Sequence, residues 1–132
     1  MKSRTNDIHI RAAKALISPA VLQDDLPLGD EQAKRIQAWR QQVTRIITGK
    51  DKRLMVIVGP CSIHDPLAAL DYASRLHKLA SRLEDDLLII MRVYFEKPRT
   101  TVGWKGMIND PGLDGSFRIN DGLRLARKLL LD

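Results

Sequence analysis

Cysteine and aromatic residues are both scarce in this sequence of 132 residues. The single cysteine, Cys61, excludes a disulfide within the chain. Aromatic residues make up 5%, so aliphatic side chains must fill the core, and too few aromatics alternate with basic residues to form a stacking platform for single-stranded nucleic acid. We therefore expect no nucleic-acid partner, and the formal net charge of +6 favours small anionic ligands or an acidic surface instead.

Long apolar runs are also absent. No stretch approaches the roughly 20 residues that a membrane-spanning helix needs, and the polar start of the chain leads into no signal peptide. We expect a cytoplasmic protein without a membrane partner. The length allows one domain at most, and its 44% hydrophobic and 29% charged residues are ordinary for a globular protein.

Residues 1–28 are the least regular part of the chain and predict an N-terminal extension that packs onto something else. Its first expected elements are a short strand at Ile8–Ile10, a helical turn at Ala12–Ile17 and a short helix at Pro19–Leu26. Apolar residues at helical spacing then predict an amphipathic helix over residues 30–48. Asp30 is its expected N-cap, and Gly49 its expected stop.

Two purely apolar runs, Leu54–Val58 and Leu87–Ile90, predict strands that are buried on both faces of a parallel sheet. The second strand is expected over Leu87–Val93. A helix is predicted between the two strands. Asp65 and Pro66 mark its start, and its apolar stripe continues to Leu83. Such a crossover is parallel and right-handed almost without exception. The loops after both strands then share the carboxyl edge of the sheet, where α/β folds carry their chemistry.

A last helix, with Asn120 or Asp121 as its cap, is still in progress where the chain stops at Asp132. Two strands do not make a stable α/β sheet alone. We therefore expect this chain to be a fragment of a longer protein. In isolation it is expected to be inactive, and unfolded or aggregated.

Cations and hydroxyl groups follow the second apolar run. They are Arg92, Lys97, Arg99 and Lys105, with Thr100 and Thr101, and Pro98 and Gly103 act as hinges. Arginine offers a planar fork that fits phosphate or carboxylate, and lysine a point charge, so the loop is suited to an anionic ligand. A solvated basic loop behind a buried strand explains the charges equally well.

Cys61 lies in a Gly-Pro-Cys-Ser loop directly after the first strand. Its thiol could be a nucleophile, a metal ligand or a small buried apolar group, and the last is usual for a lone cysteine. His64 could join it at a metal, but a zinc site needs more ligands than this pair. Trp104 is expected to pack rather than to shield the loop from water.

Two segments, Gly59–Pro66 (GPCSIHDP) and Met91–Gly106 (MRVYFEKPRTTVGWKG), together resemble the type I 3-deoxy-D-arabino-heptulosonate-7-phosphate (DAHP) synthases, above all the bacterial enzymes regulated by aromatic amino acids. The similarity extends through Ile108–Pro111 and Gly122–Leu131, and more loosely over the N-terminal part. The resemblance implies an α/β fold, a (β/α)₈ TIM barrel behind a mostly helical extension. Residues 1–50 would be the extension, and residues 51–132 the truncated barrel with its first two strands.

The resemblance also implies a transferase that condenses phosphoenolpyruvate with D-erythrose 4-phosphate and water. The products are 3-deoxy-D-arabino-heptulosonate 7-phosphate and phosphate, in the first step of the shikimate pathway to chorismate and the aromatic amino acids. It implies Cys61 as ligand of a divalent metal ion (Mn, Fe, Co or Zn), Arg92 as a phosphoenolpyruvate-binding cation and Lys97 as the catalytic lysine between the substrates. Arg99 and Thr100 match the site for the phosphate of erythrose 4-phosphate.

The family's remaining metal ligands, a histidine and two carboxylates, would lie beyond Asp132. As partners, the resemblance implies a homo-oligomer and an aromatic amino acid as feedback inhibitor. The alternative hypothesis is a non-catalytic module that binds a phosphorylated metabolite through the same basic loop. Metal-dependent consumption of phosphoenolpyruvate only when erythrose 4-phosphate is present separates the two.

Overall fold

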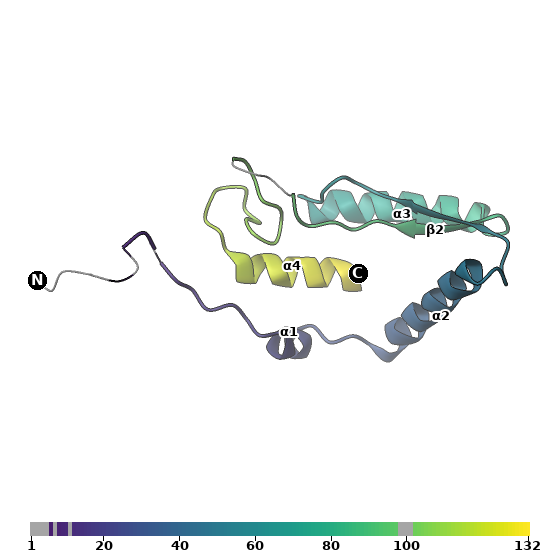
Figure 1. Ribbon diagram of the computed structural model, residues 1–132, viewed down its shortest axis with the longest axis horizontal. Helices are drawn as coiled ribbons and strands as arrows, with labels where there is room; N and C mark the ends of the chain where they lie inside the picture. The colour runs from purple at the N-terminus through teal and green to yellow at the C-terminus, as the bar shows by residue number, and fades with distance from the viewer. Residues whose placement is uncertain (1–5, 7, 11, 98–101) are drawn as a thin grey trace, which may run out of the picture.

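The computed structural model describes residues 6, 8–10, 12–97 and 102–132. Its elements, in chain order, are α1 (Pro19–Asp25), α2 (Asp30–Ile47), β1 (Leu54–Val58), α3 (Pro66–Arg82), β2 (Leu87–Met91) and α4 (Ile119–Leu131). Helix α3 contacts β2 and α4 (Figure 1), and Ala15 and Ile17, just before α1, bond to the first turn of α4. Within the described ranges, no helix combines the length and the apolar character that a bilayer crossing requires.

Strands β1 and β2 pair in parallel, in a register that runs from Leu54 opposite Leu87 to Val58 opposite Met91. This confirms the predicted strand–helix–strand crossover, although β2 ends two residues before the predicted Val93. The expectation that both faces are buried is wrong for β1, because Leu54 is 65% and Ile57 62% exposed. In the described part of the chain only β2 borders this strand, so its apolar side chains have few neighbours.

Helix α3 begins as predicted. The Asp65 carboxylate accepts hydrogen bonds from the backbone N–H groups of Leu67 and Ala68, at 2.8 and 3.3 Å, and Pro66 occupies the first turn. This start lies directly behind the loop that follows β1. The loop therefore leads into a helix whose first turn is fixed.

Helix α2 ends as predicted, with Gly49 at φ +72°, a backbone conformation that favours glycine. Its predicted cap is wrong, because Gly29 is the N-cap and Asp30 already belongs to the helix. The Gln32 side chain accepts a hydrogen bond from the Gly29 N–H at 3.0 Å. Asp30 instead places its charge in the first turn, where it complements the helix dipole.

Two predictions for the N-terminal segment are wrong. Ile8–Ile10 is not a strand, since Ile8 and His9 lie in an exposed turn with no described strand beside them. Ala12–Ile17 is not a helical turn, because its backbone groups bond to α4 instead of to one another. The predicted short helix is present as α1, where Ser18 accepts a hydrogen bond from the Val21 N–H.

The predicted cap of α4 is wrong as well. Arg118 is the N-cap and makes no side-chain cap bond, while Asn120 and Asp121 lie inside the first turn. The core lies between α3, α4 and the segment after β2. Its buried residues are Ile63, Ala69, Met107 and Ala126, with Val93, Phe95, Trp104, Ile108 and Leu129 packed against them. The division at residue 50 into extension and barrel stays a prediction.

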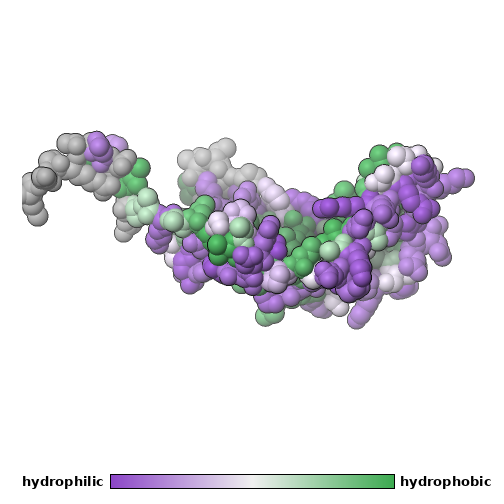
Figure 2. Space-filling model, turned by 90° about the horizontal axis from the view of Figure 1, so that it is seen from below, coloured by the Kyte–Doolittle hydropathy of each residue, from purple (hydrophilic) through white to green (hydrophobic). Residues whose placement is uncertain are grey.

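A groove of about 990 Å³ runs between α2, α3 and β2. All five residues of β2 line it, together with Trp39, which is 55% exposed. Figure 2 shows hydrophobic residues at the surface between hydrophilic ones on the face that it draws. The groove thus exposes aliphatic side chains and the Trp39 ring that no described residue covers.

Arg53 joins three elements where the chain enters β1. Its guanidinium forms an ion pair with Asp51 at 2.9 Å and donates to Gln42 on α2 and to the carbonyl of Glu84 before β2. The hydrogen bonds from the Arg53 side chain, and next from its backbone N–H, hold the pKa of Asp51 below its usual value. The ionised carboxylate therefore stabilises the folded state.

A pH dependence follows from this pair. Because the folded pKa of Asp51 is lowered, its contribution is present above the usual carboxylate pKa and is lost as pH falls through the folded pKa. Asp51→Asn should therefore lower the free energy of unfolding at pH 7, and the difference from the unsubstituted protein should shrink at about pH 3. Urea unfolding at both pH values of a full-length protein that contains this chain tests this, and a difference that is constant with pH would contradict it.

Candidate functional site

The loop after β1, residues 59–65, is fastened to the segment that follows β2. The Arg92 N–H donates to the Val58 carbonyl, and the Ile63 N–H donates to the Tyr94 carbonyl, both at 2.8 Å. Gly59 allows this approach, because a Cβ atom there would lie 2.3 Å from the Arg92 carbonyl oxygen. We call residues 59–65 the cysteine loop.

The Arg92 side chain closes the cysteine loop from the other strand. Its Nη1 donates to the carbonyl oxygens of Pro60, at 2.7 Å, and Cys61, at 2.9 Å. The guanidinium carbon lies 4.5 Å from the centre of the Tyr94 ring, within cation–π distance. No described residue accepts a hydrogen bond from Nε or Nη2, so these two donors are left for a ligand.

Lys97 lies across from the cysteine. Its Nζ is 3.7 Å from the Cys61 Sγ, and the thiol is exposed. Neither Lys97 nor Arg92 forms an ion pair with a carboxylate of the described ranges. Two cations without a described acidic partner, beside an exposed thiol, form a site that attracts anions.

A short antiparallel pairing fixes the backbone of Lys97. The Lys97 N–H donates to the Lys105 carbonyl at 2.8 Å, and the Met107 N–H donates to the Phe95 carbonyl at 2.7 Å, on either side of the bridge between Glu96 and Gly106. Met107 is 1% exposed, so it anchors one side of this pairing in the core. We call residues 95–97 with 105–107 the loop neck.

Of the predicted site residues, the structure brings together Cys61, Arg92 and Lys97 at the carboxyl edge of β1 and β2. Arg99 and Thr100 lie outside the described residues. The roles of all five stay predictions.

The sequence analysis missed Tyr94 as a member of this site. Its signal was available, because residues two apart in an extended segment point to the same side, and Tyr94 is two residues beyond Arg92. Trp104 packs against the core as predicted, and its Nε1 donates to the Asp110 carbonyl at 2.8 Å.

A divalent metal needs several ligands, and the described residues supply few at this place. Cys61 offers one soft sulfur donor, and a Mn, Fe, Co or Zn ion needs further ligands beside it. Within the described part of the chain, no group of three or more His, Cys, Asp or Glu residues is placed to hold a metal ion. These residues alone do not complete a metal site.

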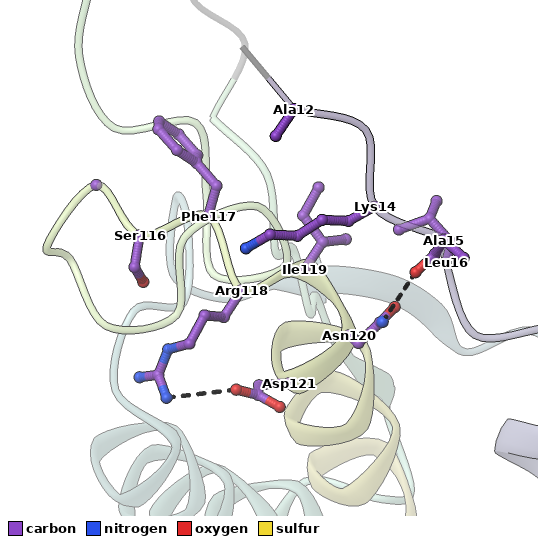
Figure 3. A pocket seen from close by; sticks show the side chains of 11 residues that line it. Ala12, Lys14, Ala15, Leu16, Ser116, Phe117, Arg118, Ile119, Asn120 and Asp121 are labelled. Carbon is purple, nitrogen blue, oxygen red and sulfur yellow. Dashed lines mark hydrogen bonds and ion pairs between the residues drawn. The ribbon is translucent and has the colours of Figure 1, made fainter.

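A second hollow, of about 670 Å³, lies between the N-terminal segment and the start of α4. It is lined by Ala12, Lys14, Ala15, Leu16 and residues 115–121 (Figure 3). The Asn120 side chain closes it, since its Oδ1 accepts from the Ile17 N–H at 2.9 Å and its Nδ2 donates to the Ala15 carbonyl at 3.1 Å. The sequence analysis did not predict this pocket.

Asn120→Ala should free the N-terminal segment from α4. Both hydrogen bonds to the segment are lost, and a typical net contribution of about 1 kcal/mol corresponds to exchange of the Ile17 amide hydrogen about 5-fold to 10-fold faster. Hydrogen exchange in a full-length protein that contains this chain measures this. Asn120→Asp is the matched control, because it keeps the acceptor for Ile17 and removes only the donor to Ala15. Equal protection of Ile17 in the Ala variant would contradict the prediction.

The sequence of this chain is similar to proteins of a known family. The family model described as the DAHP synthetase I family matches residues 25–129. The chain is 54% identical over 132 residues to the Phe-sensitive phospho-2-dehydro-3-deoxyheptonate aldolase of Escherichia coli (strain K12), covering 100% of this chain and 38% of that protein. It is 61% identical over 117 residues to the phospho-2-dehydro-3-deoxyheptonate aldolase of Amycolatopsis methanolica, covering 89% of this chain and 58% of that one. Other relatives are named Tyr-sensitive and Trp-sensitive.

A solved structure agrees with these sequence matches. The phospho-2-dehydro-3-deoxyheptonate aldolase from Francisella tularensis SCHU S4 superposes with a TM-score of 0.88 at 54% identity, over 93% of this chain and 36% of that one. The predicted fold, the first two parallel strands of a TIM barrel with their helices, is thereby confirmed. The chain spans well under half of the length of the Escherichia coli and Francisella proteins.

Proposed function

This chain belongs to the DAHP synthetase I family, and from that membership we propose that it carries part of the active site of an enzyme that condenses phosphoenolpyruvate with D-erythrose 4-phosphate. The observation that carries the proposal is the meeting of Arg92, Lys97 and Cys61 at the carboxyl edge of β1 and β2. Both substrates carry phosphate, and two cations without described acidic partners are suited to hold like-charged molecules close together.

The reaction joins C3 of phosphoenolpyruvate to the aldehyde carbon of erythrose 4-phosphate. Water adds at C2, and the phosphate leaves. Lys97 would give a proton to the aldehyde oxygen as the new bond forms, in the role of general acid. Arg92 would hold phosphoenolpyruvate through Nε and Nη2, while Nη1 stays on the cysteine loop. Arg99 and Thr100 remain the proposed site for the phosphate of the second substrate.

The metal requirement belongs to the same proposal. Cys61 would supply one ligand, and a bound divalent metal would polarise the aldehyde as a Lewis acid. Lys97 lies 3.7 Å from the Cys61 Sγ, which supports a position of the lysine beside the proposed metal ligand. The other ligands would come from residues other than those that the structure describes.

Regulation and assembly are proposed on the relatives' names and on the resemblance of the N-terminal part. Relatives named Phe-, Tyr- and Trp-sensitive support an aromatic amino acid as feedback inhibitor of this protein. A homo-oligomer in which residues 1–50 take part is the proposed assembly.

A chimera tests the function directly. In it, this chain replaces the segment of the Escherichia coli Phe-sensitive relative that it matches over its whole length. We expect consumption of phosphoenolpyruvate that requires erythrose 4-phosphate and is abolished by a chelator. Binding of phosphoenolpyruvate without turnover would overturn the proposal and favour the non-catalytic binding module.

The isolated chain of 132 residues should show no turnover and no cooperative thermal transition. Its described sheet has two strands, and β1 leaves Leu54 and Ile57 exposed, so little apolar surface holds the sheet together. Circular dichroism during heating tests this, with the chimera as the folded control. A sharp two-state transition of the isolated chain would refute the expectation.

A further inference from the structure

Among the described residues, Tyr94 is the aromatic residue that lies against a cation of the site. Its ring lies 4.5 Å from the Arg92 guanidinium carbon, and its carbonyl accepts the N–H of Ile63 from the cysteine loop. The ring therefore touches the side chain of Arg92, while the backbone of the same residue holds the loop that Arg92 also bonds. Tyr94 thus contacts both the Arg92 side chain and the cysteine loop.

The contacts of Arg92 divide its guanidinium into a held part and an available part. Nη1 donates to the carbonyls of Pro60 and Cys61, and the guanidinium carbon lies over the Tyr94 ring. Nε and Nη2 are neighbouring donors on one edge of the plane, and together they form the fork that binds a carboxylate or phosphate in bidentate fashion. A bidentate bond tolerates little rotation of the plane.

The two carbonyl bonds set that plane at one corner only. Both are made by Nη1, and hydrogen bonds tolerate roughly 30° of misalignment, so the opposite edge can still tilt when only these bonds hold the guanidinium. The Tyr94 ring limits this tilt, because it lies in contact with the guanidinium carbon and movement away from the ring weakens the cation–π attraction. The edge formed by Nε and Nη2 is thus held in one orientation before a ligand arrives.

We propose that Tyr94 is a positioning residue, whose ring orients the Arg92 guanidinium so that its Nε and Nη2 edge receives the phosphate or carboxylate of phosphoenolpyruvate. The inference rests on the proposed function for the identity of the ligand. Tyr94 needs no contact with the substrate for this role. The ring is required and the hydroxyl is not.

The test measures phosphoenolpyruvate binding to the chimera by calorimetry, with Tyr94→Leu and Tyr94→Phe in the presence of Arg92 and of Arg92→Gln. With Arg92, Tyr94→Leu should weaken the Kd about 10-fold, and Tyr94→Phe should stay within about 2-fold, since it keeps the ring. With Arg92→Gln, Tyr94→Leu should cause no further loss. The KM for erythrose 4-phosphate should not move.

Two results would overturn the inference: an unchanged Kd in Tyr94→Leu, or the same loss with Arg92 and with Arg92→Gln, which is the result that a purely packing role gives. Tyr94→Met, which is also without a ring, replaces Tyr94→Leu if that variant fails to fold. The proposed function fails separately, when the unsubstituted chimera binds phosphoenolpyruvate but does not turn over. The binding test of Tyr94 remains decisive in that case.

Discussion

Lys97→Ala should lower the kcat of the chimera by about 10²-fold to 10⁴-fold, the range for loss of a positioned general acid. The Nζ of Lys97 lies 3.7 Å from the Cys61 Sγ, and no described carboxylate pairs with it. In the proposed mechanism, Lys97 gives a proton to the aldehyde oxygen as the new carbon–carbon bond forms. The loss should therefore fall on the chemical step more than on binding.

Two further variants separate the proton from the charge. Lys97→Arg keeps a cation but cannot give up its proton at neutral pH, so it should remain about 10²-fold or more below the parent. Lys34→Ala is the matched control, because Lys34 pairs with Glu31 in an exposed ion pair on α2, and its loss should leave kcat within about 2-fold. Formation of the heptulosonate product and release of phosphate are the measurements. Turnover of Lys97→Ala within a few-fold of the parent would remove Lys97 from the proposed role.

The elements that were predicted correctly are the ones that depend on local signals. The Asp65–Pro66 start of α3, the Gly49 stop of α2 and the apolar run of β1 each act through their own neighbours in the chain. The parallel pairing followed from the crossover rule, which needs only the order of the elements. Local chemistry was sufficient in these places.

The errors arise where a distant partner decides. Asn120 was a reasonable helix cap, but its amide bonds to Ala15 and Ile17, more than 100 residues earlier in the chain. The same bonds draw Ala12–Ile17 away from a helical turn. The sequence of Ala12–Ile17 does not indicate that it bonds to Asn120, and the sequence around Asn120 does not indicate it either. Sequence analysis therefore assigns each segment a role within its own neighbourhood, a helical turn and a helix cap.

The site was predictable in its parts, and the contacts between them required the fold. Lys97 and Cys61 are 36 residues apart, and their distance of 3.7 Å depends on the register of β1 against β2. The bond from Arg92 to two carbonyls of the cysteine loop could not be predicted either, because backbone acceptors leave no mark in a sequence. Residue types thus indicated an anion site, and the sheet supplied its geometry.

Gly106→Ala should be the most damaging small substitution in the loop neck. Gly106 has φ +124°, a conformation that side chains rarely adopt, and a Cβ atom there would lie 2.2 Å from the Phe95 carbonyl oxygen. Backbone strain and a clash with an atom that cannot move aside act together, so we expect a loss of about 4 kcal/mol in the free energy of unfolding. Because the Phe95 carbonyl accepts the Met107 N–H beside Lys97, kcat should fall as well.

Gly115→Ala is the matched control for Gly106→Ala. Gly115 also has a positive φ, of +71°, but nothing lies within 4 Å of the Cβ position, so only the strain of about 1 kcal/mol applies. Urea unfolding and kcat of both chimera variants give the comparison. Equal free energies of unfolding for the two variants would contradict the prediction, because the loop neck would then accommodate the added Cβ atom with little loss of stability. A fall in kcat confined to Gly106→Ala would instead tie the packing of this one backbone atom to the placement of Lys97, since both depend on the same antiparallel pairing.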